Sequence, residues 1–179
     1  MKKVLAGIAA DCRTWDIQKK RGRKMRRKDR AIEDFAELLK IIEACAVCRV
    51  AMQDEEGLYI VPLSFGYSVE AGVLHLYMHS AKEGRKVRAF NQKAAVAFEM
   101  DCGYELTPGE TACQHGCRYQ SVVGSGRIAP IESVASKQRA LEALMRHLTG
   151  TQWSIQPAEA ETVQVYDLTV EQVSGKARR

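Results

Sequence analysis

Apolar residues recur along much of the chain at every second position, which is the period of a half-buried β-strand. In the clearest stretch, 73–79, Leu74, Leu76 and Met78 alternate with Val73, His75, Tyr77 and His79. Further predicted strands lie at 45–53, 58–67, 94–101, 118–128 and 162–173. Two stretches, 31–44 and 133–148, instead repeat apolar residues every three or four positions and predict amphipathic helices. Strands joined mainly by tight turns favour a mainly β fold, an antiparallel sheet or barrel with helices at its corners.

Two predicted strands contain backbone that something other than a neighbouring strand is expected to face. Pro62 interrupts the stretch 58–67, and because proline has no N–H to donate, it marks a sheet edge or a bulge. Gly124 and Gly126 share one face of a later strand, and this spacing lets another backbone or a flat ligand approach closely. The segment 103–116 is rich in turn residues and is expected to be a loop.

The stretch 73–79 ends in a pattern typical of a helix start. Ser80 and Glu83 have the S-x-x-E spacing of a capping box, in which the two side chains satisfy free backbone N–H groups of a helix expected to run to about Gln92. Four basic residues lie within about two turns of that start: Lys82, Arg85, Lys86 and Arg88. Cations beside a helix N-terminus favour an anion such as a phosphate. An ordinary junction with a solvated basic face is the alternative.

Charge is distributed unevenly along the 179 residues. Residues 1–30 hold 12 Lys and Arg against 3 acidic residues, whereas residues 31–179 hold 15 against 19. Residues 1–24 are therefore expected to be a basic, disordered extension, and residues 25–179 one mildly acidic domain. Clustered cations can bind nucleic acid through its phosphates, but a solvated tail or an upstream start codon is the simpler interpretation, so no nucleic-acid partner is expected.

The six cysteines predict neither a metal site nor a disulfide framework. Cys45 and Cys48 have CxxC spacing inside a predicted strand, where residues three apart point to opposite faces. A second group matches no common zinc template: Cys102, Cys113, His115 and Cys117. Without a convincing export signal, the thiols are expected to be reduced and the protein cytoplasmic.

Several common sites and segments are missing from the sequence. Neither GxGxxG after a strand nor GxxxxGK[ST] occurs, which excludes the common dinucleotide and P-loop cradles. No stretch approaches the roughly 18 apolar residues of a membrane span, so no membrane partner is expected. A phosphate site would therefore have to be the predicted strand–helix junction.

Five short strings give the chain a resemblance to a known family. They are, in order, CRVA at 48–51, VPLSFGY at 61–67, HSAKEGRK at 79–86, YQSVVGSGR at 119–127 and SGK at 174–176. Together they resemble the pyridoxamine 5'-phosphate oxidase-like flavoproteins, and most closely the branch called nitroimidazole-resistance (Nim) proteins. The match runs from about Met25 to Arg178, so residues 1–24 lie outside it.

This resemblance implies a split β-barrel of about six antiparallel strands, a homodimer, and FMN held in a groove between the subunits. It places the FMN phosphate at Ser80 and Lys86, with Arg85 close by, in agreement with the anion site inferred from the junction. It places backbone of the segment 61–64 against the isoalloxazine ring. The full set of cofactor-binding residues that it implies is Val61, Pro62, Leu63, Ser64, His79, Ser80, Arg85, Lys86, Tyr119, Ser121, Val122 and Lys176.

Two functions follow as hypotheses from the resemblance. In the first, the protein is an FMN-dependent oxidoreductase in which NAD(P)H reduces the flavin and the flavin reduces a small planar acceptor such as a nitroimidazole. His79 is then the catalytic candidate, although a lone histidine at a strand end is more often structural. In the second, the protein is a non-catalytic module that stores or senses flavin, or binds haem. The sequence identifies neither the acceptor nor the preferred nicotinamide.

Overall fold

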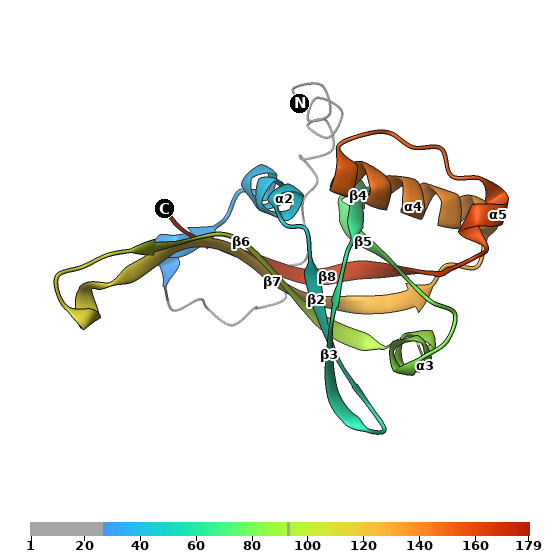
Figure 1. Ribbon diagram of the computed structural model, residues 1–179, viewed down its shortest axis with the longest axis horizontal. Helices are drawn as coiled ribbons and strands as arrows, with labels where there is room; N and C mark the ends of the chain where they lie inside the picture. The colour runs from blue at the N-terminus through green and yellow to red at the C-terminus, as the bar shows by residue number, and fades with distance from the viewer. Residues whose placement is uncertain (1–26, 93) are drawn as a thin grey trace.

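The described residues of this computed structural model, 27–92 and 94–179, form one antiparallel sheet with peripheral helices (Figure 1). The strands are β1 (Ala31–Ile32), β2 (Cys48–Asp54), β3 (Gly57–Leu63), β4 (Gly66–Glu70), β5 (Val73–Ser80), β6 (Ala95–Thr107), β7 (Gly116–Pro130) and β8 (Gln164–Arg178). The helices are α2 (Phe35–Ala44), α3 (Arg85–Asn91), α4 (Val134–Thr149) and α5 (Pro157–Ala160). The mainly β class is confirmed, with eight strands in the described part where about six were expected. The predicted basic extension, 1–24, lies outside the described residues.

The two ends of the sheet are brought together by the chain itself. The sheet follows the path β3-β2-β6-β7-β8-β5-β4, and β1 pairs with β8 beside it. β3 and β4 are thus the terminal strands, yet only Ser64 and Phe65 separate them in sequence. Because so short a connection spans at most about 11 Å, the sheet must curl until its edges approach each other. Phe65 is completely buried at this corner, and the result is the split β-barrel that the resemblance implies.

The barrel interior is filled by the alternate residues that the two-residue period selects. On β5, Leu74, Leu76 and Met78 are fully buried, as the sequence predicts. Helix α2 is capped by Asp34, whose carboxylate accepts a hydrogen bond from the Ala36 N–H at 2.9 Å. Its apolar face adds five buried side chains to the core: Phe35, Leu38, Leu39, Ile41 and Ile42. Each of these contributes about 1.5–3 kcal/mol by leaving water, which fixes the helix on the sheet.

Helix α4 lies in direct backbone contact with β4. A Cβ added to Gly66 would come within 2.3 Å of the backbone nitrogen of Leu144. About one turn further along the helix, the His147 Nε2–H donates to the carbonyl of Cys45 at 2.8 Å. The helix stops at Gly150, whose φ of 68° is the left-handed conformation that ends many helices. The predicted helix 133–148 is therefore confirmed, and a glycine sets its distance from the sheet.

The expectation of a loop over 103–116 is correct for 108–115, which connects two strands, but wrong for 103–107 and for Gly116, which belong to β6 and β7. β6 and β7 continue past the barrel as a long hairpin, with Thr107 paired to Gly116, and Figure 1 shows this arm extending away from the rest of the molecule. A register shift between Cys102 and Glu105 lets the ladder resume after an irregularity. Because most side chains of the arm are exposed, its sequence lacks the apolar alternation that marks a half-buried strand.

Two predicted boundaries also differ from the structure. The last strand was expected to close at the segment 174–176, but β8 continues to Arg178 because β7 and β1 pair with it on either side. The helix predicted over 31–44 begins only at Phe35, since Ala31 and Ile32 form β1. Hydrogen bonds between distant segments decide both boundaries.

The sequence prediction for Pro62 is confirmed, and so is the first of the two alternatives for the glycines, close approach by another part of the backbone. Pro62 is exposed on β3, which is a terminal strand of the sheet. A Cβ on Gly126 would lie 2.1 Å from the carbonyl oxygen of Thr169, and one on Gly124 would lie 2.4 Å from the ring of Phe98. Other parts of this chain therefore occupy the space beside both glycines, where a ligand could otherwise have approached.

Gly66→Ala is expected to lower the free energy of unfolding by about 3 kcal/mol, because the new methyl group meets α4 backbone that cannot rotate away. Urea denaturation followed by circular dichroism measures the loss. Gly103→Ala is the control: Gly103 has a φ of +64°, but an added Cβ meets only a flexible side chain at 3.6 Å. Backbone strain alone should cost that variant about 1–2 kcal/mol. Equal losses in the two variants would contradict the tight contact.

Candidate functional site

The predicted junction at Ser80 has a different local structure from the one expected. Ser80 is the last residue of β5, where it pairs with Gln164, and its hydroxyl donates to the Ala81 carbonyl at 2.7 Å. Helix α3 begins at Arg85, preceded by Gly84 with a φ of 128° and no side-chain cap. The predicted capping box is therefore wrong. The ladder to β8 holds Ser80 in the sheet, and this tertiary pairing overrides the local helix-start signal.

The buried side chain of Tyr166 packs against the junction between β5 and α3. Tyr166 is completely buried, and its hydroxyl donates to Asn91 Oδ1 at 3.3 Å. Its ring meets that of Phe90 edge-on, with centroids 5.0 Å apart. Burial raises the pKa of Tyr166, and a hydrogen bond with Ser80 partly opposes the rise. These contacts connect β8, the end of β5 and α3 into one packed unit.

Arg85 is already engaged by a carboxylate. Its guanidinium donates to both oxygens of Asp54 at 2.7 and 2.8 Å and lies 4.4 Å above the ring of Tyr59. A third contact, to Glu56, spans 3.6 Å. The arginine keeps the pKa of Asp54 below its ordinary value of 3.8. Arg85 therefore ties α3 to the β2–β3 hairpin, and a ligand anion would have to compete with Asp54 for it.

At the same junction, Lys86 lies close enough to His79 for its positive charge to act on the histidine. Lys86 is half-buried, and no carboxylate within 4.0 Å of it belongs to the described part of the chain. His79 keeps an exposed surface, yet enough protein surrounds its ring for partial burial to lower its pKa, and the positive charge of Lys86 lowers it further. Arg88 contacts Glu56 at 3.3 Å, and Lys82 is exposed. Among the four predicted cations, Lys86 is thus the one that faces His79 without a compensating acid.

The segment 61–64 approaches the junction from the edge of the sheet. Val61 and Leu63 are buried, whereas Ser64 is exposed. Because β3 pairs only with β2 among the described strands, its outer backbone groups are available to a ligand. The β4–β5 ladder ends at the pair Gly66 and Tyr77, so Ser64 and His79 each lie two residues beyond it, at one end of the barrel. We call Ser64, His79, Ser80 and Lys86 the junction group.

The remaining predicted residues come together elsewhere. Ser121 pairs with Lys176 across β7 and β8, and Tyr119 and Val122 flank Ser121 on β7. Val122 is completely buried, and the other three side chains are half-buried. Lys176 also pairs with Ala31 of β1. We call Tyr119, Ser121, Val122 and Lys176 the arm-base group, because they lie where the long hairpin leaves the barrel.

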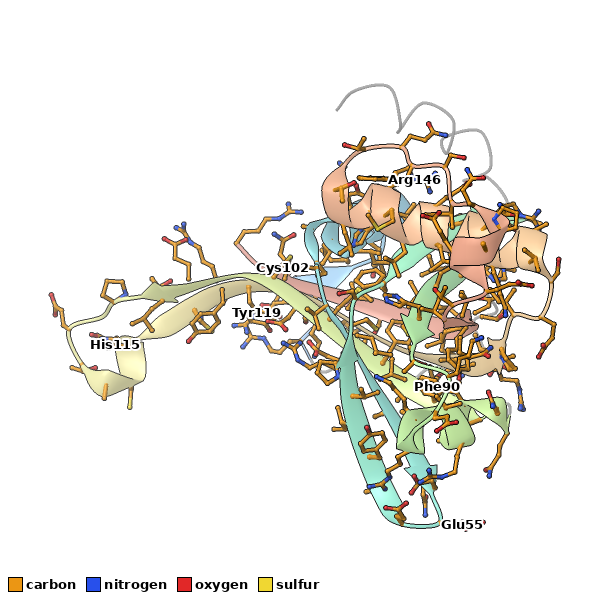
Figure 2. All side chains as sticks on the ribbon, turned by 45° about the vertical axis from the view of Figure 1, so that its right-hand side comes forward. Glu55, Phe90, Cys102, His115, Tyr119 and Arg146 are labelled. Atoms are coloured by element: carbon orange, nitrogen blue, oxygen red, sulfur yellow. The ribbon has the colours of Figure 1, made fainter. Side chains whose placement is uncertain are left out.

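The structure does not bring the two groups together within one chain. His79 pairs with Val165 and Ser121 pairs with Lys176, so the two groups are attached to β8 eleven residues apart. At about 3.3 Å per residue this is roughly 35 Å of strand. In Figure 2, Tyr119 lies at the base of the arm, whereas Phe90 of α3 lies in the body of the molecule. One flavin mononucleotide is far too short to contact both groups in a single subunit.

The cysteines take no part in either group. Cys45 ends helix α2 and Cys48 begins β2, so the expectation that both lie in one strand is wrong. Both thiols are buried, and burial raises the pKa of Cys48 to about 12. No set of three or more His, Cys, Asp or Glu side chains in 27–92 and 94–179 is arranged to hold a metal ion.

Comparison with known proteins identifies the family. The model of the pyridoxamine 5'-phosphate oxidase family matches residues 34–177, which contain the barrel and both groups of site residues. The chain belongs to this family. No curated protein matches the sequence significantly.

Solved structures similar to this pyridoxamine 5'-phosphate oxidase family member include several with flavin-related descriptions. A candidate 5-nitroimidazole antibiotic resistance protein from Bacteroides thetaiotaomicron VPI-5482 is 32% identical, with a TM-score of 0.70 over 82% of this chain and 86% of the other. A FAD-binding protein from Mesorhizobium loti is 25% identical, with a TM-score of 0.58 over 84% and 98%. A FAD- and haem-binding protein from Mycobacterium smegmatis, 17% identical with a TM-score of 0.71 over 84% and 74%, shares the fold.

Two residues that organise the site of this family member were missed by sequence reasoning. Asp54 is the last residue of β2, 31 residues before Arg85, and nothing local to either residue indicates their ion pair. Tyr166 lies in a strand with irregular alternation, and its burial depends on α3 packing over it. None of the helices in the described residues has the length and apolar character needed to cross a membrane.

The Asp54–Arg85 pair predicts a pH-dependent stability. Because the pKa of Asp54 is lower in the folded chain than its ordinary 3.8, the pair stabilises the fold above about pH 4, and this contribution is lost as the pH falls through the lowered value. Asp54→Asn should therefore unfold at lower urea concentration than the native chain at pH 7, and the difference should shrink below about pH 4.

Glu56→Gln is the matched control for this prediction, since it removes a more exposed carboxylate from the same hairpin. The contacts of Glu56 with Arg85 at 3.6 Å and with Arg88 at 3.3 Å are exposed and contribute little, so the effect of this variant should be small at every pH. A destabilisation by Asp54→Asn that stays constant from neutral to acid pH would contradict the assignment.

Proposed function

We propose that the protein is an FMN-dependent oxidoreductase that uses NAD(P)H to reduce a small planar acceptor such as a nitroimidazole. Membership of the pyridoxamine 5'-phosphate oxidase family and the 32% identity to a candidate 5-nitroimidazole resistance protein support this assignment. The observation that carries it is the uncompensated charge of Lys86 beside His79, at the end of a barrel whose edge strand has free backbone groups. When bound there, FMN would supply the hydride- and electron-transfer chemistry.

The junction group fits the phosphate end of FMN. Lys86 offers an ammonium group without a competing acid, and a charge-assisted hydrogen bond to phosphate is stronger than one between neutral groups. Arg85 has a different part in the proposal. Because Asp54 and Glu56 hold its guanidinium, it positions the first turn of α3, and with it Lys86, against the hairpin.

The free edge of β3 fits the ring end of the cofactor. Backbone N–H and C=O groups of the segment 61–64 can donate to and accept from the polar edge of an isoalloxazine ring without a specialised side chain. Pro62 is exposed on that strand, while Val61 and Leu63 anchor it in the core. The strand is thereby held rigid from one side and remains accessible from the other.

The arm-base group can join this site only from a second subunit. Within one chain, eleven residues of β8 separate the arm-base group from His79. The family resemblance implies that both contact the same flavin, and this requires a partner copy. A two-fold dimer would place the arm base of each subunit against the junction group of the other and create two equivalent sites. The proposed homodimer is therefore required for a complete site.

His79 is the proposed proton donor to the acceptor. Partial burial and Lys86 lower its pKa, so its imidazolium is a stronger acid than a free histidine. The His79 side chain is exposed at the junction, where an acceptor can reach it.

Anaerobic spectroscopy tests the function directly. The FMN-loaded protein should lose its flavin absorption on addition of NADH or NADPH and regain it on addition of a nitroimidazole. His79→Ala should keep the cofactor and slow the second step. If neither nicotinamide reduces the flavin, or if the purified protein shows a haem spectrum instead, the non-catalytic flavin- or haem-binding module is the better description.

Lys86→Ala is expected to weaken FMN binding about 10- to 150-fold, which corresponds to the roughly 1.5–3 kcal/mol of a charge-assisted hydrogen bond. Riboflavin, which lacks the phosphate, should bind the variant and the native protein equally. Fluorescence quenching titrations measure both affinities, and FAD is included as a third ligand. The exposed Lys82→Ala is the control and should change neither. Equal loss of FMN and riboflavin binding would show that Lys86 does not contact the phosphate.

Subunit mixing tests whether the site is shared. Lys86→Ala damages the junction group, and the double variant Ser121→Ala with Lys176→Ala damages the arm-base group of the other subunit. Each variant alone should bind FMN weakly. After joint refolding, half of the dimers should be mixed and contain one intact site, so about a quarter of the native high-affinity sites should return. No recovery in a mixture proven to contain mixed dimers would contradict a shared site.

A further inference from the structure

A cavity of about 500 Å³ lies between helix α4 and the outer surface of β4, β5 and β8. It is separate from the core, because the side chains that β5 contributes to it, His75 and Tyr77, point away from the barrel interior. It is also separate from the junction group, whose members do not line it. A cavity of this size can hold a small organic molecule.

The strand side of the cavity carries two separate hydrogen-bonded clusters, His75 with Asp167 and Tyr77 with Ser68 and Glu70. His75 Nδ1 lies 2.9 and 3.0 Å from the two carboxylate oxygens of Asp167, and this hydrogen bond raises the pKa of His75 against the opposing effect of burial. The Tyr77 hydroxyl lies 2.8 Å from Ser68 Oγ, and both hydroxyls can donate to Glu70, at 3.3 and 3.1 Å. Burial raises the pKa of Tyr77 to about 12, so the phenol stays protonated at neutral pH.

The helix side of the cavity has small residues at its centre and cations at its ends. Ala140 and Ala143 are buried there, and their short side chains leave the space open. Arg139 and Arg146 flank them, seven residues and therefore about 10 Å apart along α4. Figure 2 shows Arg146 on this helix. Arg139 donates to Ser136 Oγ at 3.0 Å, but neither arginine has a carboxylate within 4.0 Å in the described part of the chain.

The charges in the cavity are not equally satisfied. Three carboxylates line it, and each already accepts hydrogen bonds: Asp167 from His75, Glu70 from the strand hydroxyls, and Glu142 from the backbone N–H of Ile155 at 3.2 Å. The two arginines are exposed at the rim of the cavity, and neither guanidinium group has an ionic partner in the described part of the chain. Guanidinium binds planar carboxylates through paired hydrogen bonds, so the unmet requirement of this cavity is for an anion of that shape.

We propose that the cavity under α4 is a binding site for a small organic carboxylate, held by Arg139 or Arg146 from the helix side. The site does not require a bound flavin. Tyr77 and His79 are alternate residues on one face of β5, about 7 Å apart, so a ligand in the cavity would be a close neighbour of the junction group without being part of it.

Isothermal titration calorimetry of the full-length protein with matched probe pairs tests the proposal. Acetate and benzoate supply the carboxylate, and acetamide and benzamide are neutral molecules of nearly the same shape. At least one carboxylate should bind saturably, one per chain, and about ten-fold or more tightly than its amide. The double variant Arg139→Gln with Arg146→Gln, whose changes lie on a helix surface, should lose this preference.

Arg118→Gln removes an exposed guanidinium from the distant hairpin and is the control, which should leave carboxylate binding unchanged. Circular dichroism confirms that each variant is folded before titration. The proposal is overturned if neither carboxylate binds more tightly than its amide, or if the double variant retains the preference. Binding that Arg118→Gln weakens as much as the double variant would also overturn it, because the site would then lie elsewhere.

Discussion

The backbone ladder of β8 is the constraint on which the structure depends. Its 15 residues pair with β5, β7 and β1, so one strand fixes the positions of the barrel, of α3 through Tyr166, and of the arm through Lys176. Regular strand geometry also sets the alternation by which β5 faces the core with one set of side chains and α4 with the other. It separates the two groups of candidate site residues by more than a flavin can span. The second subunit in the proposed function is thus a consequence of strand length.

At the junction between β5 and α3, one basic residue is neutralised by an acid and its neighbour is not. Two adjacent basic residues of α3 have different surroundings: Arg85 is held by Asp54, whereas Lys86 lies beside His79 without an acid. The bidentate arginine stabilises the position of the helix, and the lysine keeps its charge available. The same contrast recurs under α4, where the carboxylates are satisfied within the protein and the arginines are not. In both places a cation without an acidic partner, rather than the number of cations, indicates where we propose that an anion binds.

Much of the fold could be predicted from local periodicity, because side-chain alternation and helical spacing report burial directly. The strand 73–79, the helix 133–148 and the edge position of Pro62 are of this kind. The hairpin arm could not be predicted, since its ladder joins exposed residues whose sequence carries no burial signal. The capping box at Ser80 failed because pairing with Gln164, 84 residues later, competes with a local signal. Family resemblance identified the residues of the candidate site, but only the register of β8 shows that they fall into two separated groups.

The central claim is that a complete flavin site exists only between two subunits. Native mass spectrometry of the protein titrated with FMN measures this most directly, because it resolves chain number and cofactor number in each species. The flavin-bound species should contain two chains and up to two FMN molecules, and the single chain should carry none at concentrations that saturate the dimer. A single chain that binds FMN as tightly as the dimer would contradict the claim.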